Sequence, residues 1–300
     1  MQGGIISIID HRGDPVASQR ASVNGIRLHY VTAGDGEPVL LLHGVPKTSY
    51  YWRKVLPLLT PHHTVVAPDM RGLGDSEHAE TGYDMATVAD DFAALMAHLG
   101  YERYRVVGED WGAAAAYQLA ARHPEHVTQL VYQEMILSGF GLEDYSFLTS
   151  ENVASYVWLW HINFYAVPEF PEMLIAGHER EYFSYFIKHE AQDPNAIPPD
   201  AIDEYVRCYS SPGGLRCMAN IYRATLTDAE QNRAAATTPL EMPVLAVASE
   251  PFIGADNERV MREVATDVRA VSFPYGHQLA EECPDELAAA YLAFFAAHAS

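Results

Sequence analysis

The chain is short of cysteine, of basic residues and of long apolar runs. Its three cysteines, Cys208, Cys217 and Cys283, have no metal-ligand spacing, so neither a zinc site nor a disulfide framework is expected. A Cys208–Cys217 disulfide is an alternative to the favoured arrangement, buried free thiols. No run approaches the roughly 20 apolar residues of a membrane-spanning helix. We therefore expect neither a membrane span nor a bound metal ion.

The shortage of basic residues leaves the chain strongly acidic. It has 19 Lys and Arg residues against 40 Asp and Glu, for a formal net charge of -21. Such a charge repels phosphate backbones and anionic lipids, which argues against nucleic-acid and membrane binding and, more weakly, against an anionic substrate. The opening residues, MQGGIISIIDHRGDP, lack the basic stretch and apolar run of a signal peptide, so a cytoplasmic protein is expected.

What is present indicates an α/β protein. Hydrophobic residues make up 49% of the 300 residues, enough for one large domain with an insertion. Short β-rich runs alternate with helical patterns, which predicts a parallel sheet with helical crossovers. The predicted strands are IRLHYVTAG, PVLLLHG, HTVVAPD, YRVVG, VTQLVYQE, MPVLAVASE and RAVSFPYGH.

The middle of the chain has a different pattern. Residues 137–238 are rich in aromatic side chains and helical in spacing, with no strand alternation, as in WLWHINFY and REYFSYFIKHE. We expect a helical cap over the carboxyl ends of the strands, where open α/β sheets bind ligands. The predicted domains are a core of residues 1–136 and 239–300 and a cap of residues 137–238.

The segment VVGEDWGAAAA places Asp110 at the tip of a tight strand-turn-helix. Small residues flank it at Gly108 and Gly112, as in the G-x-S-x-G nucleophile elbow of serine hydrolases. An aspartate at this position is either a nucleophile in place of serine or a cap of the following helix. The choice depends on what else the topology brings to the same edge of the sheet.

Three further segments belong to that edge. HGVP follows a strand and nominates the backbone N–H of Val45, with that of Trp111, as an oxyanion hole. His277 follows the last strand, in the chain order nucleophile, acid, histidine. Two acids compete to orient it: Glu134 at the end of VTQLVYQE, which we favour, and Asp256 in the loop after MPVLAVASE.

Taken together, these motifs carry a family resemblance. HGVPKTSYYWRKVLPLL, VVAPDMRGLGDS, VGEDWGAA and YGHQLAEE resemble the α/β-hydrolase superfamily, in its aspartate-nucleophile branch of epoxide hydrolases and dehalogenases. The resemblance covers nearly the whole chain and implies the α/β-hydrolase fold. Tyr222, in ANIYRATL, resembles the ring-opening tyrosine of epoxide hydrolases. His161 stands where the Cif-like bacterial epoxide hydrolases have histidine.

A carboxylate suits chemistry at a saturated carbon. It is ionised near neutral pH and displaces a leaving group without a base, giving an ester of its own side chain. His277 would then activate water to hydrolyse that ester. The leading hypothesis is an epoxide hydrolase that forms a vicinal diol without a cofactor, with a small apolar epoxide and water as its reactants. His43, Pro46 and Trp160 are expected to contact the substrate.

Two alternatives are a dehalogenase acting by the same nucleophile and a non-catalytic binding protein of this fold. Haloalkane dehalogenases usually have asparagine where Val45 stands, and fluoroacetate dehalogenases follow the nucleophile with arginines where this chain has small residues. The intact nucleophile, acid and histidine argue against a receptor. A homodimer is a family-level expectation only.

One residue departs from the epoxide-hydrolase pattern. Glu109 precedes the nucleophile, where histidine is common, and a like charge facing the pocket would raise the pKa of Asp110 or demand a partner. Strand alternation predicts that Glu109 points away from the pocket.

Overall fold

A single sheet of eight strands organises the chain. The computed structural model describes residues 8–155 and 158–298. Residues 1–7 lie outside the described residues, and with them part of the opening segment on which the signal-peptide prediction was based. The strand order is β1-β2-β4-β3-β5-β6-β7-β8. The strands are β1 (Ala17–Val23), β2 (Ile26–Ala33), β3 (Glu37–Leu42), β4 (His63–Pro68), β5 (Tyr104–Glu109), β6 (Val127–Gln133), β7 (Val244–Ser249) and β8 (Val268–Phe273).

The sheet is mostly parallel. Only β1 with β2 and β2 with β4 pair antiparallel, while every pair from β4 to β8 is parallel. The central parallel strands β5 and β7 are fully buried on both faces, which matches the continuous apolar runs of the sequence, whereas the edge strand β8 is partly exposed. The seven strands predicted from the sequence are all present as β2 to β8, so the predicted α/β architecture is confirmed.

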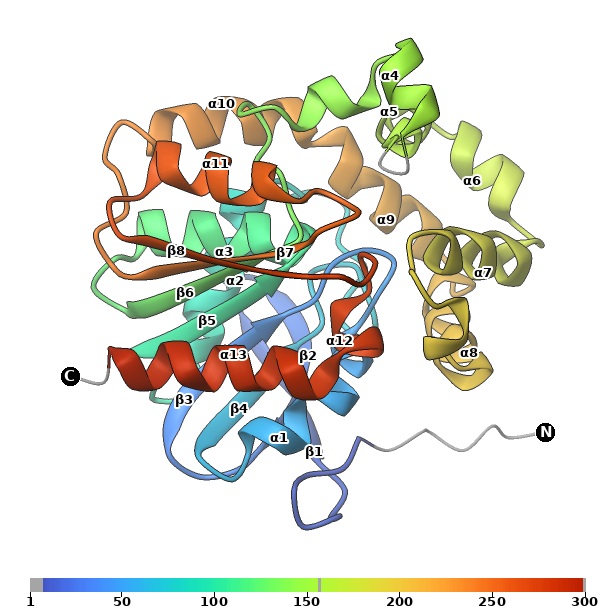
Figure 1. The fold of residues 1–300 in the computed structure, drawn as a ribbon. Coiled ribbons are helices and arrows are strands. Elements are labelled where there is room, and N and C mark those ends of the chain that lie inside the picture. The colour runs from blue at the N-terminus through green and yellow to red at the C-terminus, as the bar shows by residue number, and fades with distance from the viewer. Residues whose placement is uncertain (1–7, 156–157, 299–300) are drawn as a thin grey trace.

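Helices cover both faces of the sheet. In Figure 1, α13 and α1 lie on one side of the sheet and α2, α3 and α11 on the other, and the contacts of α1 with α13 and of α2 with α3 agree with this arrangement. These helices are η1 (Ser49–Lys54), α1 (Leu56–Leu59), α2 (Met85–His98), α3 (Trp111–Arg122), α11 (Ala255–Val264), α12 (Leu279–Glu282) and α13 (Pro284–Ala297), where η denotes a 3-10 helix.

The described residues between β6 and β7 form a series of helices joined by loops, with no strand of the sheet among them. Figure 1 shows α4 to α8 gathered beyond one end of the sheet, while α10 returns to contact α2 and α3. The elements are η2 (Leu142–Ser146), α4 (Ser150–Ala154), α5 (Trp160–Ala166), α6 (Phe170–Ile175), α7 (Glu179–His189), η3 (Pro194–Ala196), α8 (Pro199–Tyr209), α9 (Gly214–Arg223) and α10 (Thr225–Ala235). We call this insertion the cap.

The topology gathers distant segments at one edge. Strands β3, β5, β6 and β7 are neighbours and parallel, so the loops that follow them emerge side by side. All three cysteines are buried and free, as the sequence favoured. None of the helices described combines the length and apolar character that crossing a membrane requires.

Candidate active site

A tight elbow between β5 and α3 presents Asp110. Its backbone has φ 55° and ψ -130°, a strained conformation for a residue with a side chain. The turn closes only because its neighbours are small: a Cβ on Gly108 would lie 2.4 Å from the carbonyl oxygen of Gly112, and one on Gly112 would lie 2.3 Å from that of Leu42. Backbone atoms therefore lie so close to Gly108 and Gly112 that a side chain at either position would clash, which explains the two glycines of the G-x-D-x-G pattern.

The Asp110 carboxylate faces the two backbone N–H groups that the sequence nominated for an oxyanion hole. Although Asp110 occupies the N-cap position of α3, its side chain makes no capping hydrogen bond. Instead, the N–H of Val45 donates to its Oδ1 at 2.8 Å, and the N–H of Trp111 also donates to the carboxylate. Burial would raise the pKa of Asp110, but His277 and Lys47 lower it below its ordinary value. The group is an anion near neutral pH.

His277 bridges this carboxylate and a second one. Its Nδ1 lies 2.9 Å from Oε2 of Glu134, and its Nε2 lies 3.5 Å from Oδ2 of Asp110. Glu134 directly follows β6 with φ 52°, and the N–H of Ser249, the last residue of β7, donates to its other oxygen. The two carboxylates that contact His277, those of Asp110 and Glu134, thus directly follow the ends of β5 and β6.

Asp256 lies elsewhere. It is in the first turn of α11, where it accepts hydrogen bonds from the Tyr145 hydroxyl and, at 2.7 Å, from Nε of Arg259. The two candidate acids of the sequence are therefore distinguished by position. Glu134 contacts the imidazole, and Asp256 holds the cap to α11 through Tyr145.

The charge on His277 depends on its carboxylate neighbours. Burial and the Lys47 charge oppose protonation, but Asp110, Glu134 and Glu190 together raise the pKa of His277 to about 10. The imidazole is therefore protonated beside the free Asp110 anion. Removing the negative charge of Asp110, as ester formation does, would lower the pKa of His277 and release its capacity to accept a proton.

A buried ion pair lies beside His277. Nζ of Lys47 bonds Oε1 of Glu109, and both atoms are 3.5 Å from Nε2 of His277. Oε2 of Glu109 accepts the N–H of Gly44 at 3.2 Å. Glu109 does not line the pocket, as strand alternation predicted, but it does contact the histidine. Its partner Lys47 was not predicted, although it stands within the quoted motif HGVPKTS.

Tyr222 and His161 face Asp110 from the cap. The Tyr222 ring packs edge-on against those of Trp111 and His161, with centroids 5.2 and 5.6 Å apart. Burial and the Asp110 charge raise the pKa of Tyr222 well above its ordinary value, so its phenol stays protonated. Burial lowers the pKa of His161 to about 4, so its imidazole is neutral. Both groups are hydrogen-bond donors near neutral pH.

Two connected pockets lie between cap and core. The inner one, of about 30 Å³, is lined by apolar side chains together with Asp110, Trp111, Glu134, His161, Tyr222 and His277. The outer one, of about 230 Å³, includes Trp160. Leu159, His161, Glu190 and Phe252 line both pockets and mark their junction. Of the predicted contact residues, Trp160 thus belongs to the outer pocket.

His43 and Pro46 were expected to contact substrate, and the structure places neither in the lining of these pockets. His43 is fully buried. Its Nδ1 donates to the carbonyl oxygen of Gly44 at 2.7 Å, and its Nε2 accepts the N–H of Met70 at 3.1 Å. Both ring nitrogens of His43 hold the loops after β3 and β4 in place, so His43 has a structural role instead of the expected contact with substrate.

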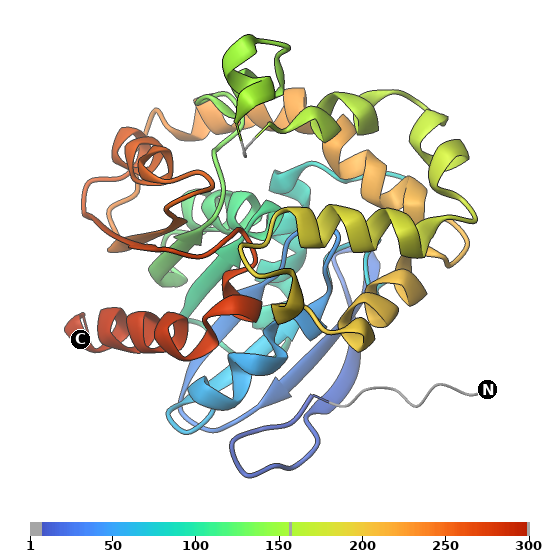
Figure 2. The ribbon, with the colours of Figure 1, turned by 45° about the vertical axis from the view of Figure 1, so that its right-hand side comes forward.

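Glu190 was not predicted. It follows α7, and its carbonyl oxygen accepts the N–H of His277 at 2.8 Å. Figure 2 shows α7 crossing in front of the strands, with the chain after it passing beside the segment that precedes α12. Burial chiefly raises the pKa of Glu190 to about 7. A single glutamate at a cap-helix end carries no motif, so the sequence offered no signal for it.

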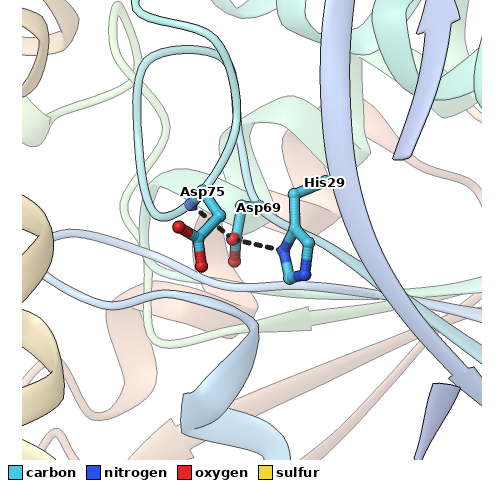
Figure 3. A group of neighbouring side chains, drawn as sticks. All are labelled: His29, Asp69 and Asp75. Atoms are coloured by element: carbon cyan, nitrogen blue, oxygen red, sulfur yellow. Dashed lines mark hydrogen bonds and ion pairs between the residues drawn. The ribbon is translucent and has the colours of Figure 1, made fainter. Parts of the chain in front are cut away.

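One group of His and Asp side chains in the described chain comes close enough to share a cation: His29 on β2, Asp69 after β4 and Asp75 (Figure 3). Oδ2 of Asp69 accepts from Nδ1 of His29 at 2.7 Å and from the N–H of Asp75 at 2.9 Å, and Oδ1 accepts the N–H of Ser49. Both oxygens are therefore engaged by protein donors. We assign this group the role of a hydrogen-bond centre for the loop after β4.

Comparisons with known proteins agree with this architecture. Residues 37–272 match the family model described as alpha/beta hydrolase fold. The chain is 36% identical over 285 residues to the soluble epoxide hydrolase of Corynebacterium sp. (strain C12), covering 94% of this chain and 98% of that protein. It is 28% identical over 278 residues to the fluoroacetate dehalogenase of a Burkholderia species, covering 89% of each.

Among solved structures, Cfl2 of Burkholderia cenocepacia superposes with a TM-score of 0.88 at 37% sequence identity, covering 93% of this chain and 95% of that chain. The likeness thus spans the sheet and the inserted helices together. With the family model matching most of its length, the chain belongs to the α/β-hydrolase family.

Proposed function

We propose that the protein is an epoxide hydrolase that converts an epoxide and water to a vicinal diol through an ester on Asp110. The observation that carries the proposal is that the two carboxylate oxygens of Asp110 have different partners. Oδ1 accepts from the oxyanion-hole N–H of Val45, while Oδ2 faces His277. A carboxylate held in this way serves first as a nucleophile and then as the carbonyl of an ester.

In the first step, Oδ2 attacks a ring carbon of the epoxide. A new C–O bond forms, the C–O bond of the ring breaks, and the leaving oxygen takes a proton. Tyr222 and His161 line the pocket with Asp110 and supply donors for that oxygen. The indole N–H of Trp111 bonds the Tyr222 oxygen, which leaves the phenol proton free to point at the substrate.

In the second step, water attacks the carbonyl carbon of the ester. Esterification removes the charge of Asp110 and lowers the pKa of His277, so the imidazolium gives up its extra proton, which returns through solvent to the group that protonated the epoxide oxygen. The neutral Nε2 then takes a proton from the attacking water. Negative charge then develops on Oδ1, which already lies at the N–H groups of Val45 and Trp111. Collapse of the intermediate breaks the ester bond, and the departing diol oxygen takes the proton back from His277.

The relatives support this proposal and also supply its rival. The soluble epoxide hydrolase is more similar to this chain than the fluoroacetate dehalogenase is. No Lys or Arg is among the described residues that line the inner pocket, and α3 begins with Trp111, Gly112 and Ala113 rather than with arginines. A haloacid carboxylate would therefore meet three carboxylates and no Lys or Arg, and the one imidazolium there, His277, is already shared by Asp110 and Glu134. This favours a neutral epoxide over a haloacid.

The decisive experiment traps the ester. In His277→Gln the first step should proceed and the second should stall, so mass spectrometry of the variant with an aromatic epoxide should show the protein plus one substrate. His126→Gln, on the surface, is the matched control and should turn over normally. An unmodified His277→Gln protein, or halide release as the only activity across epoxides and halo compounds, would overturn the proposal.

The two acids can be tested with the same assay. Glu134→Gln should slow ester hydrolysis strongly because His277 loses the carboxylate at Nδ1, whereas Asp256→Asn should hydrolyse the ester at nearly the native rate. Single-turnover kinetics separate ester formation from ester hydrolysis. Equal defects in the two variants would argue against the assigned role of Glu134.

A further inference from the structure

The outer pocket has a lining that the reaction does not explain. Five aromatic side chains surround it, joined by one carboxylate: Trp158, Trp160, Tyr185, Phe186, Phe252 and Glu190. None of the described residues that line it is Lys or Arg. Aromatic rings present a negative face, and a group of them beside an anion is the arrangement by which proteins bind organic cations.

Glu190 gives this pocket its charge. Gln278 donates to its Oε2 at 3.3 Å, and its side chain lines both pockets. It also follows the last residue of α7, an 11-residue helix, whose carboxyl end carries the negative pole of the helix dipole. Helix end and carboxylate therefore both favour a positive charge at the junction of the pockets.

The charged groups near Glu190 have partners of their own, and the His277 imidazolium is balanced by the carboxylates of Asp110 and Glu134. His189 also lines the outer pocket. His161 is neutral near pH 7, and Lys47 is neutralised by its ion pair with Glu109. Asp110 and Glu109 raise the pKa of Glu190, and His277 and Lys47 lower it. A cation beside Glu190 would favour its ionised form.

The inner pocket is too small to hold more than the reacting part of a substrate. Its volume is about 30 Å³, against about 230 Å³ for the outer pocket. An epoxide placed at Asp110 must therefore extend past Glu190 into the aromatic pocket. Whatever substituent the substrate carries there meets rings and a carboxylate.

We propose that the outer pocket is a binding site for an organic ammonium group, and that the substrate is an epoxide carrying such a cation at its far end. This second clause rests on the proposed epoxide hydrolysis, whereas the first does not. A neutral aromatic group would contact the rings but would leave the Glu190 carboxylate with no positive charge beyond its hydrogen bond from Gln278.

Binding is tested without catalysis. Isothermal titration calorimetry compares choline with 3,3-dimethyl-1-butanol, its uncharged carbon isostere, on the wild-type protein. The pH is above 8, so that the Glu190 carboxyl, with its pKa of about 7, is ionised. Choline should bind at least about tenfold more tightly than the isostere, since the two differ only in charge. Equal affinities, or no choline binding at millimolar concentration, would overturn the site.

Two variants locate the cation. Glu190→Gln removes the charge with little change in shape and should weaken choline binding about tenfold or more, and Tyr185→Leu should weaken it through loss of a ring. The matched control is Glu181→Gln, which removes the same charge from the exposed first turn of α7. If Glu190→Gln and Glu181→Gln bind choline alike, the assignment of Glu190 is wrong.

Catalysis then tests the substrate class. Terminal epoxides bearing a trimethylammonium group on spacers of increasing length are compared with their tert-butyl isosteres. At the best spacer length, kcat/KM should favour the cation about tenfold in wild type and lose that preference in Glu190→Gln. Choline binding without any epoxide turnover would leave the cation site standing and reject the hydrolase proposal, whereas turnover of neutral epoxides without a cation preference would reject the substrate class.

Discussion

At the scale of single residues, the coupling between Asp110 and His277 is the feature with the sharpest consequence. Their charges support one another across 3.5 Å, so the protonation of His277 reports the state of Asp110. The same imidazole is a cation beside the free carboxylate and a base beside the ester. One pair of groups thus serves both steps of the proposed reaction.

Replacing Asp110 by Asn should lower the pKa of His277. The carboxamide has the shape of the ester and lacks the negative charge that helps to raise this pKa to about 10. A fall of about 1–3 units is expected for loss of an opposite charge at this distance. NMR titration of the imidazole signals measures it, with Asp256→Asn as the control that should leave His277 unchanged. An unaltered titration in Asp110→Asn would contradict the coupling.

The buried Lys47–Glu109 pair makes a separate prediction. Lys47→Met should cost about 3–5 kcal/mol of unfolding free energy because it leaves the Glu109 carboxylate buried and unpaired. The deficit should shrink as pH falls, since protonation of Glu109 removes the unpaired charge. Chemical denaturation at two pH values measures both effects, and Lys188→Met on α7 is the control.

The double variant Lys47→Met/Glu109→Gln completes the cycle. It should be more stable than Lys47→Met alone, because no buried charge then lacks a partner. If the double variant is instead as unstable as the sum of the two single changes, packing rather than charge holds these side chains in place.

The site was only partly predictable at this scale. Asp110, Glu134 and His277 were named from motifs and chain order, and the structure brings them together. The sequence favoured Glu134 but left Asp256 as an alternative, because the two acids follow neighbouring strands, β6 and β7. The partners Lys47 and Glu109 are separated by 62 residues, and no local pattern joins them.

At the scale of elements, the end of α7 and the loop before α12 connect the cap to His277. The N–H of His277 donates to the carbonyl oxygen of Glu190, and Gly276 lies against the same segment. A Cβ on Gly276 would lie 2.4 Å from the backbone N of Gln192 and 2.5 Å from the carbonyl oxygen of Glu190. The histidine is therefore positioned by the cap as well as by the sheet.

Gly276→Ala should lower kcat more than it changes KM, because it displaces His277 from Asp110, whereas the atoms nearest the added Cβ belong to Glu190, Ala191 and Gln192 and not to the rings of the outer pocket. Overpacking of this kind should also cost about 1–3 kcal/mol in unfolding free energy. Steady-state kinetics with a thermal unfolding scan measure both. Tyr275→Phe, which removes only a hydroxyl 3.4 Å from Glu286, is the neighbouring control. Native kcat in Gly276→Ala would mean that this connection does not position the histidine.

Elements with a strong apolar period were the predictable ones. The buried strands and α2 follow from their hydrophobic spacing, and the aromatic middle segment is helical as expected. By contrast, the sequence did not predict β1. Its first four residues are exposed, and it lies at the edge of the sheet with β2 as its neighbour. Edge strands depend on backbone pairing rather than on burial, which side-chain patterns do not record.

At the scale of the whole molecule, charge connects surface and site. The net charge of -21 creates a negative field, and the inner pocket adds Asp110, Glu134 and Glu190 to it. A field of one sign around a cleft raises the local concentration of oppositely charged ligands. The acidic surface and the aromatic pocket would thus favour the same class of substrate.

A change in ionic strength should separate the contribution of the surface charge to kcat/KM from that of Glu190. For the trimethylammonium epoxide, kcat/KM should fall as ionic strength rises, because exposed charges are screened beyond about 8 Å at physiological salt. The tert-butyl isostere should show no such fall. Glu190→Gln should have a lower kcat/KM for the cation at every salt concentration and almost the same slope, because the surface field is unchanged while the local contact is lost. If the slope disappears in Glu190→Gln, the whole salt effect arises at Glu190, and the surface charge has no part in capturing the substrate.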